Sequence, residues 1–138
     1  MRAGPRQIWL CADDYGISPG VNGAIRELIA RQRLNATSVM VAAPHLGEEE
    51  AGALDLLNSG EPRAALGLHV TLTAPFTPLS PGFAAVREGA FLPLGEMMRL
   101  AIARRLQPEM LVIEIATQLR AFLDAFGRPP DFLDGHQH

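Results

Sequence analysis

The chain has little cysteine, no surplus of basic residues and no long apolar run, and each shortage excludes a class of protein. It has a single cysteine, Cys11, which excludes an internal disulfide framework and a zinc module built on paired cysteines. Such low cysteine usage is common in proteins of reducing compartments. The formal net charge of -3 leaves no basic surface for a phosphate backbone, so we expect no nucleic-acid partner. No stretch reaches the roughly 18 apolar residues that span a bilayer, and the apolar run near the start is too short for a signal peptide. We therefore expect a cytoplasmic protein without a membrane span.

The composition is that of an ordinary globular protein. The chain has 138 residues, of which 48% are hydrophobic and 20% are charged, enough for one domain with a buried core. We find no internal repeat, low-complexity tract or linker that would mark a boundary, so residues 1–138 are treated as a single domain.

Short apolar runs alternate with helical patterns along the chain. We predict strands over residues 7–12, 36–43, 66–73 and from 132 onward, and helices that begin at 18–19 and cover 48–58, 94–106 and 108–126. In the last helix an apolar stripe is expected from Leu111, Ile115, Leu119, Phe122 and Phe126. Residues 74–93 are rich in proline and read as a long loop. This order predicts an α/β fold with a parallel sheet and crossover helices.

Residues suited to metal chemistry fall where the predicted strands end. Asp13 and Asp14 follow the first strand, His69 lies within or at the end of the third, and Asp134 and His136 end the fourth. Ligands of α/β sheets and barrels bind at the carboxyl ends of the strands, because the loops there converge. An aspartate pair alone is more often a turn device, and a lone histidine is a core residue about as often as a ligand. Their convergence from three strands favours the functional interpretation.

One carboxylate and two imidazoles form a compact ligand set that leaves coordination positions for water and substrate, as in hydrolytic zinc, magnesium or manganese sites and non-haem iron sites. Asp14, His69 and His136 can supply this set. Asp13 is adjacent to Asp14, and neighbouring side chains of an extended chain diverge, so we expect Asp13 beside the metal site as a general base. His45, which follows the second strand, is a further candidate ligand.

Three segments of the sequence, residues 11–22, 67–73 and 132–138, resemble in order and spacing the YdjC-like family of carbohydrate deacetylases. Members of that family remove an N-acetyl group from an amino sugar with a divalent metal, on a barrel-like α/β fold. The resemblance implies that Asp14, His69 and His136 bind the metal and that Asp13 is the catalytic carboxylate. It implies magnesium as the metal, with zinc as the alternative, and an N-acetylated sugar or oligosaccharide as the substrate. His138 matches a further histidine of the family's motif.

The chain departs from the family pattern in two ways. Cys11 stands where family members often have asparagine, and the family's chains are much longer. We therefore expect the N-terminal portion of a YdjC-like domain, an incomplete (β/α) barrel-like fold whose unpaired strand edge favours a homo-oligomer or poor solubility. Two other functions remain open: another metal-dependent sugar hydrolase, such as a phospho-glycosidase, and a non-catalytic metal- or sugar-binding module.

Overall fold

The structure is a computed structural model that describes residues 8–61 and 63–137. Its elements follow in the order β1 (Cys11–Tyr15), α1 (Pro19–Ala30), β2 (Ala36–Val39), α2 (Glu48–Leu57), β3 (Ala65–Val70), β4 (Val86–Arg87), β5 (Ala90–Phe91), α3 (Leu94–Ile102), α4 (Pro108–Phe126) and β6 (Phe132–Gly135). The alternation of strands and helices confirms the predicted α/β class.

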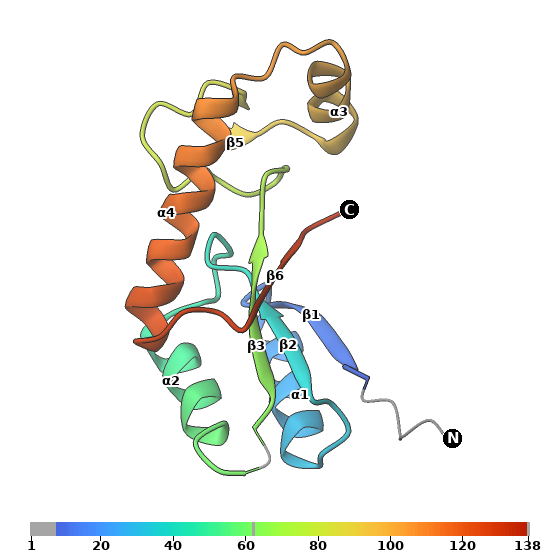
Figure 1. Cartoon of the computed structure of the whole chain (residues 1–138), viewed down its shortest axis with the longest axis vertical. Coiled ribbons are helices and arrows are strands. Elements are labelled where there is room, and N and C mark those ends of the chain that lie inside the picture. The colour runs from blue at the N-terminus through green and yellow to red at the C-terminus, as the bar shows by residue number, and fades with distance from the viewer. Residues whose placement is uncertain (1–7, 62, 138) are drawn as a thin grey trace, which may run out of the picture.

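Four strands form one parallel sheet in the order β1-β2-β3-β6, and β4 and β5 form a separate antiparallel pair. Each parallel pair is joined through a helical crossover, as such pairing requires. In Figure 1 the β3 arrow points toward the end of the molecule at which β5 and α3 lie, and α4 runs back alongside the sheet. The strand ends that carry the candidate residues therefore face the region built from β5 and α3.

The main core lies between the sheet and helices α1, α2 and α4. Its buried members are Tyr15, Ile25, Ile29, Val39, Ala51, Leu54, Ala64, Leu66, Leu68, Val70, Phe122 and Phe126. In β3 the core takes every second residue, so Gly67 and His69 point to the opposite face of the sheet, as the sequence predicts. We call this opposite face, which carries Ser38, Gly67, His69 and Asp134, the site face.

Gly67 leaves room for an aromatic ring on the site face. A Cβ at this position would overlap the ring of Phe132, the residue paired with Gly67 on β6. Trp9, which precedes β1 at the far edge of the sheet, reaches the same ring, with the two ring centroids 4.9 Å apart. The side chain of a residue that precedes one edge strand thus meets a side chain of the other edge strand, β6.

Local signals for the helix ends are confirmed. The Ser18 hydroxyl accepts a hydrogen bond from the Val21 N–H at 3.2 Å, and Pro19 is the first residue of α1. Pro108 likewise begins α4, and Gly127 ends it in the left-handed conformation, with a φ of 64°. Short-range chemistry fixes these boundaries, which is why they are visible in the sequence.

The predicted first strand is misplaced. Residues 8–10 lie before β1 and are exposed, with Trp9 58% accessible, whereas Asp13 and Asp14 lie inside the strand and do not follow it. The apolar pattern indicated burial, but the ladder to β2 starts only at Cys11. The second strand is shorter than predicted, because the chain turns after Val39 through a hydrogen bond from Ala43 N to Met40 O.

The region 74–102 also differs from the prediction. The segment read as a loop contains the β4–β5 hairpin, whose turn places Glu88 and Gly89 at positive φ, 52° and 85°. Helix α3 ends at Ile102, four residues before the predicted end. Short strands of two residues carry no periodicity, so the sequence cannot reveal them.

Helix α4 buries two polar residues that the apolar stripe does not predict. Glu114 and Gln118 are fully buried, whereas Ile115 and Leu119 are only partly buried against the core and Leu111 packs on a second cluster. Phe122 and Phe126 are buried as predicted. The middle of the helix therefore buries a polar pair, whose side chains bond to backbone groups of Thr71 and Ser80.

Within the part of the chain that the structure describes, none of the helices is long and apolar enough to cross a membrane. Strands β1 and β6 form the two edges of the parallel sheet. Association through such an edge is physically favourable, and the homo-oligomer stays a prediction.

Candidate metal centre

A β-bulge on β1 sets the direction of the two aspartates. Ala12 pairs with Thr37 and Tyr15 pairs with Val39, so Asp13 and Asp14 together lie opposite Ser38 alone. Asp14 adopts a φ of 66°, a left-handed conformation that aspartate tolerates better than most residues. Bulges commonly re-aim side chains beside active sites. Here the bulge sends two successive carboxylates into two different groups of residues.

The residue after the bulge anchors β1 to the helices. The buried Tyr15 hydroxyl donates to the Glu50 carbonyl oxygen at 2.9 Å and accepts from Arg26 Nη1 at 2.8 Å, and Arg26 also pairs with the Glu50 carboxylate. Burial raises the pKa of Tyr15 to about 12, an effect that Arg26 opposes. The phenol therefore stays neutral and holds the end of β1 against α1 and α2.

Gly16 completes the turn out of β1. Its N–H donates to the buried Asn22 side chain at 2.6 Å, and its φ is 106°. A Cβ at Gly16 would lie 3.0 Å from the Met40 carbonyl oxygen, so the close approach of β1 and β2 requires glycine. Asn22 also donates to the His45 carbonyl at 3.1 Å, which ties the turn to the segment after β2.

Three predicted ligands come together. Asp14 Oδ1 lies 3.1 Å from His69 Nε2 and 3.0 Å from His136 Nδ1, and the three ligand atoms all lie within 4.8 Å of one another. Asp14 comes from β1, His69 from β3 and His136 from the residue directly after β6. His69 is 4% exposed, and the other two are partly buried.

The arrangement fits a divalent cation. Atoms that bind one ion at about 2.1 Å lie roughly 3 to 4 Å from one another, close to the separations found here. Carboxylate and neutral imidazole are ligand types that such ions accept. Without a cation between them, His69 Nε2 and His136 Nδ1 would each have to donate a hydrogen bond to the same Asp14 oxygen.

Asp134 orients His69. Its Oδ1 lies 2.7 Å from His69 Nδ1, and the two residues are paired in register across β3 and β6. The Ser38 hydroxyl lies 3.1 Å from the same nitrogen. The shorter contact assigns the Nδ1 proton to the bond with Asp134, so Nε2, on the side of Asp14, is the nitrogen that could bind a cation. A carboxylate that fixes the tautomer in this way commonly supports histidine ligands of metals.

Asp13 belongs to a neighbouring group. Its Oδ1 accepts from the Ser38 hydroxyl at 3.2 Å and from the Cys11 thiol at 3.5 Å, and ligand atoms of Cys11, Asp13 and Asp134 lie within 4.8 Å of one another. Desolvation raises the pKa of Cys11 to about 12, and the Asp13 and Asp134 carboxylates add to this rise. The two aspartates thus diverge into different groups, as expected for neighbouring residues, and their roles as general base and ligand stay predictions.

Two further histidines were candidates. His45 is exposed and is not part of the cluster, because it lies on the turn after β2, which folds back onto Gly16 through a hydrogen bond from His45 N to Gly16 O at 3.0 Å. His138 lies outside the described residues. The candidate set of the described chain is therefore Asp13, Asp14, His69 and His136.

Sequence reasoning missed two residues that touch the site. Ser38 contacts both Asp13 and His69. Its only signal in the sequence was a hydroxyl in the second predicted strand. Phe76 packs perpendicular to His136, with ring centroids 5.5 Å apart and planes at 84°. Nothing in the sequence around Phe76 indicates this contact, because it depends on how the segment after β3 folds back.

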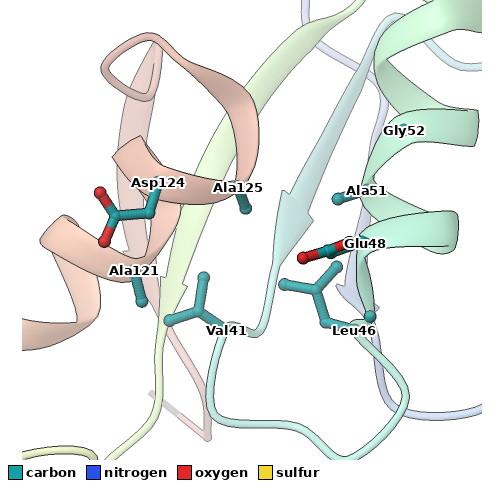
Figure 2. A pocket seen from close by; sticks show the side chains of 9 residues that line it. Val41, Leu46, Glu48, Ala51, Gly52, Ala121, Asp124 and Ala125 are labelled. Carbon is teal, nitrogen blue, oxygen red and sulfur yellow. The ribbon is translucent and has the colours of Figure 1, made fainter.

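A separate pocket lies between α2 and α4 (Figure 2). It has a volume of about 460 Å³, and its lining residues are Val41, Leu46, Gly47, Glu48, Ala51, Gly52, Ala121, Asp124 and Ala125. Small side chains of the two helices face each other there, beside Val41 and Leu46. None of the clustered ligands lines it, so this pocket is distinct from the candidate metal centre.

Three curated proteins named chitooligosaccharide deacetylase are similar to this chain. They come from Proteus mirabilis, Escherichia fergusonii and Klebsiella pneumoniae, and are 34%, 33% and 34% identical to it. Each comparison covers 92% of this chain and 47% of the relative. The chain thus spans about half the length of the curated relatives it matches.

A solved structure shares the fold. It is the crystal structure of a protein from Enterococcus faecalis to which cellobiose-phosphate cleavage has been provisionally assigned, with 27% sequence identity and a TM-score of 0.69. The similarity covers 91% of this chain and 46% of that one. Residues 7–138 match the YdjC-like protein family, and since that match takes in nearly the whole sequence, the chain belongs to this family.

Proposed function

We propose that this protein hydrolyses the N-acetyl group of an amino sugar or chitooligosaccharide in a metal-dependent reaction. The observation that carries the proposal is the convergence of Asp14, His69 and His136, with a second carboxylate, Asp13, directed beside them. The names of the three relatives supply the substrate class. An amide is a poor electrophile, so its hydrolysis at neutral pH needs both an activated water and a stabilised oxyanion.

Asp14, His69 and His136 would hold the metal. A divalent cation supplies Lewis-acid polarisation of the amide carbonyl and lowers the pKa of water. The family resemblance implies magnesium, whereas a donor set with two imidazole nitrogens is more typical of zinc, since magnesium prefers oxygen ligands. Activity should therefore be measured with zinc and with magnesium.

Asp13 is assigned the role of general base. Its hydrogen bonds from Ser38 and Cys11 both end on Oδ1, which orients the carboxylate and leaves Oδ2 to receive a proton from the attacking water. Asp134 keeps the proton of His69 on Nδ1, so that Nε2 is the nitrogen left to bind the metal. The two carboxylates thus have separate roles, since Asp13 takes a proton and Asp134 holds one in place.

The test is acetate release from N,N′-diacetylchitobiose with added Zn²⁺ or Mg²⁺. Asp13→Asn should lower turnover by about 10²-fold or more while metal content stays at the wild-type level, because the base is lost and the ligands remain. Asp124→Asn, an exposed change on α4, is the matched control and should leave both unchanged. Loss of metal together with activity in Asp13→Asn would contradict the assigned roles.

A second candidate function is cleavage of a glycosidic bond, which the name of the Enterococcus faecalis protein favours. The same assay separates the two reactions, because deacetylation releases acetate and glycosidic cleavage releases new reducing ends. If Zn²⁺ raised the thermal stability of the protein and neither product formed, a metal-binding module without catalysis would replace both. If neither ion bound at all, the cluster would be a structural network of contacts between Asp14, His69 and His136.

A further inference from the structure

Gln118 of α4 substitutes for a neighbouring strand at the end of β3. Its Oε1 accepts from the Thr71 N–H at 3.0 Å, and its Nε2 donates to the Thr71 carbonyl at 2.7 Å. Thr71 is buried and directly follows β3, so its backbone groups need partners. The Gln118 amide supplies both of them, two residues beyond the candidate ligand His69.

Glu114, one helical turn before Gln118, holds the next part of the same segment. Its carboxylate accepts from the Leu79 N–H at 3.0 Å, from the Ser80 N–H at 2.7 Å and from the Ser80 hydroxyl at 2.5 Å. Gln118 Nε2 also donates to Glu114 at 2.8 Å, so the two side chains form one buried network. Helix α4 therefore ties residues 71 and 79–80 to the same face, and we call the segment between them, residues 71–80, the tethered segment.

The tethered segment carries Phe76 to the candidate metal centre. The Phe76 ring is 7% exposed and packs perpendicular to His136. Its carbonyl accepts from the Phe91 N–H at 2.8 Å, which adds a third anchor from β5. His136 follows the end of β6, and its N–H donates to the Val70 carbonyl at 2.9 Å. The backbone of His136 is thus fixed by β3, whereas Phe76 packs against its ring.

We infer that Phe76 is a positioning residue for His136 and that the Glu114–Gln118 pair sets its place. The inference rests on the proposed metal site and adds a support for it that comes from α4. A ring held from one side by Phe76 and from another by Asp14 keeps its Nδ1 directed at the ligand cluster. Metal affinity depends on such preorganisation, and loss of an outer support typically weakens it about 10- to 100-fold. The two buried polar residues of α4 would thus support the metal site by holding Phe76 in place.

The first test measures Zn²⁺ binding to the metal-depleted protein by isothermal titration calorimetry. Phe76→Leu removes the ring and keeps an apolar side chain, and Glu114→Gln keeps the shape and removes the charge that accepts four hydrogen bonds. Both should raise the Kd for Zn²⁺ about tenfold. Phe122→Leu is the matched control: it lies on the same helix in the main core, so it should lower the unfolding midpoint without changing the Kd.

The second test uses the metal-free protein, so that it does not depend on the proposed function. With its centroid 5.5 Å from that of His136, the Phe76 ring should shift the NMR signals of the His136 imidazole protons. These shifts should be lost in Phe76→Leu, changed in Glu114→Gln and retained in Phe122→Leu. Wild-type Kd values in both Phe76→Leu and Glu114→Gln, or unchanged His136 signals in both, would overturn the inference. Absence of Zn²⁺ binding in the wild type would instead refute the metal site, and the NMR comparison would still decide whether Phe76 positions His136.

Discussion

Asp134→Asn tests how the protein prepares His69 to bind a metal. The change keeps the size of the side chain and an oxygen that can accept from His69 Nδ1, now 2.7 Å from the carboxylate. It removes the negative charge, and the amide group can also turn its nitrogen toward the ring. The substitution therefore isolates the charge of this hydrogen bond from its geometry.

The expected loss follows from the strength of the bond. A hydrogen bond to a charged group contributes about 1.5 to 3 kcal/mol and a neutral one about 0.5 to 1.5 kcal/mol, so the difference is about 1 to 1.5 kcal/mol. The Asp134 side chain is 32% exposed, and the partial contact with water keeps the estimate within this range. We expect the Kd for Zn²⁺ to rise about tenfold, the equivalent of about 1.4 kcal/mol.

The assay is calorimetric titration of the metal-depleted protein with Zn²⁺, combined with ¹⁵N shifts that report the tautomer of His69. Asp131→Asn is the control, because Asp131 stands three residues earlier and accepts from the Leu66 N–H, away from the ligands. It should keep the wild-type affinity. If Asp134→Asn bound Zn²⁺ within twofold of a wild type that binds it, a supporting role of Asp134 for the ligand His69 would be refuted.

Further predictions concern the sheet, the metal and the thiol. Gly67→Ala should lower the free energy of unfolding by about 1 to 3 kcal/mol, because the new methyl group overlaps Phe132; an unchanged urea midpoint would contradict the packing. Zn²⁺ at 100 times its Kd should raise that free energy by about 2.7 kcal/mol, and His136→Asn should remove most of the gain; equal stabilisation of the variant would exclude His136 as a ligand. The rate at which iodoacetamide alkylates Cys11 in the metal-free protein should keep rising as the pH is raised above 9, since a pKa of about 12 leaves most of the thiol protonated there. A rate that levels off near pH 9 would show that the pKa is not raised.

The order of strands and helices was predictable because residues close in the sequence mark the ends of several elements. Ser18 and Pro19 mark the start of one helix and Gly127 the end of another, and both marks rest on hydrogen bonds within a few residues. In β3 the alternation of core and site-face residues also survives in the sequence, and it places His69 on the correct side. Parallel strands then bring their ends together, which is why the ligand cluster could be anticipated from three separate segments.

The first strand was misplaced because the bulge breaks its alternation. Ala12 and Tyr15 both pack on the main core although they are three residues apart, so no regular period of two runs through the segment. The polar pair on α4 was missed for another reason. Glu114 and Gln118 are buried because they serve backbone groups of residues that lie tens of positions away, and such partners are known only once the chain has folded.

The left-handed conformation of Asp14 limits which substitutions at this position can test its role as a ligand. Most residues lose roughly 1 to 2 kcal/mol there, whereas asparagine and glycine do not. The backbone and the ligand chemistry therefore select for the same small, polar side chain at position 14. Glutamate would retain the charge and strain the bulge, and alanine would disturb both, so a loss of function in either variant could not be assigned to the lost ligand alone. Asp14→Asn changes the charge alone, and a library screened at this position should return aspartate for two independent reasons.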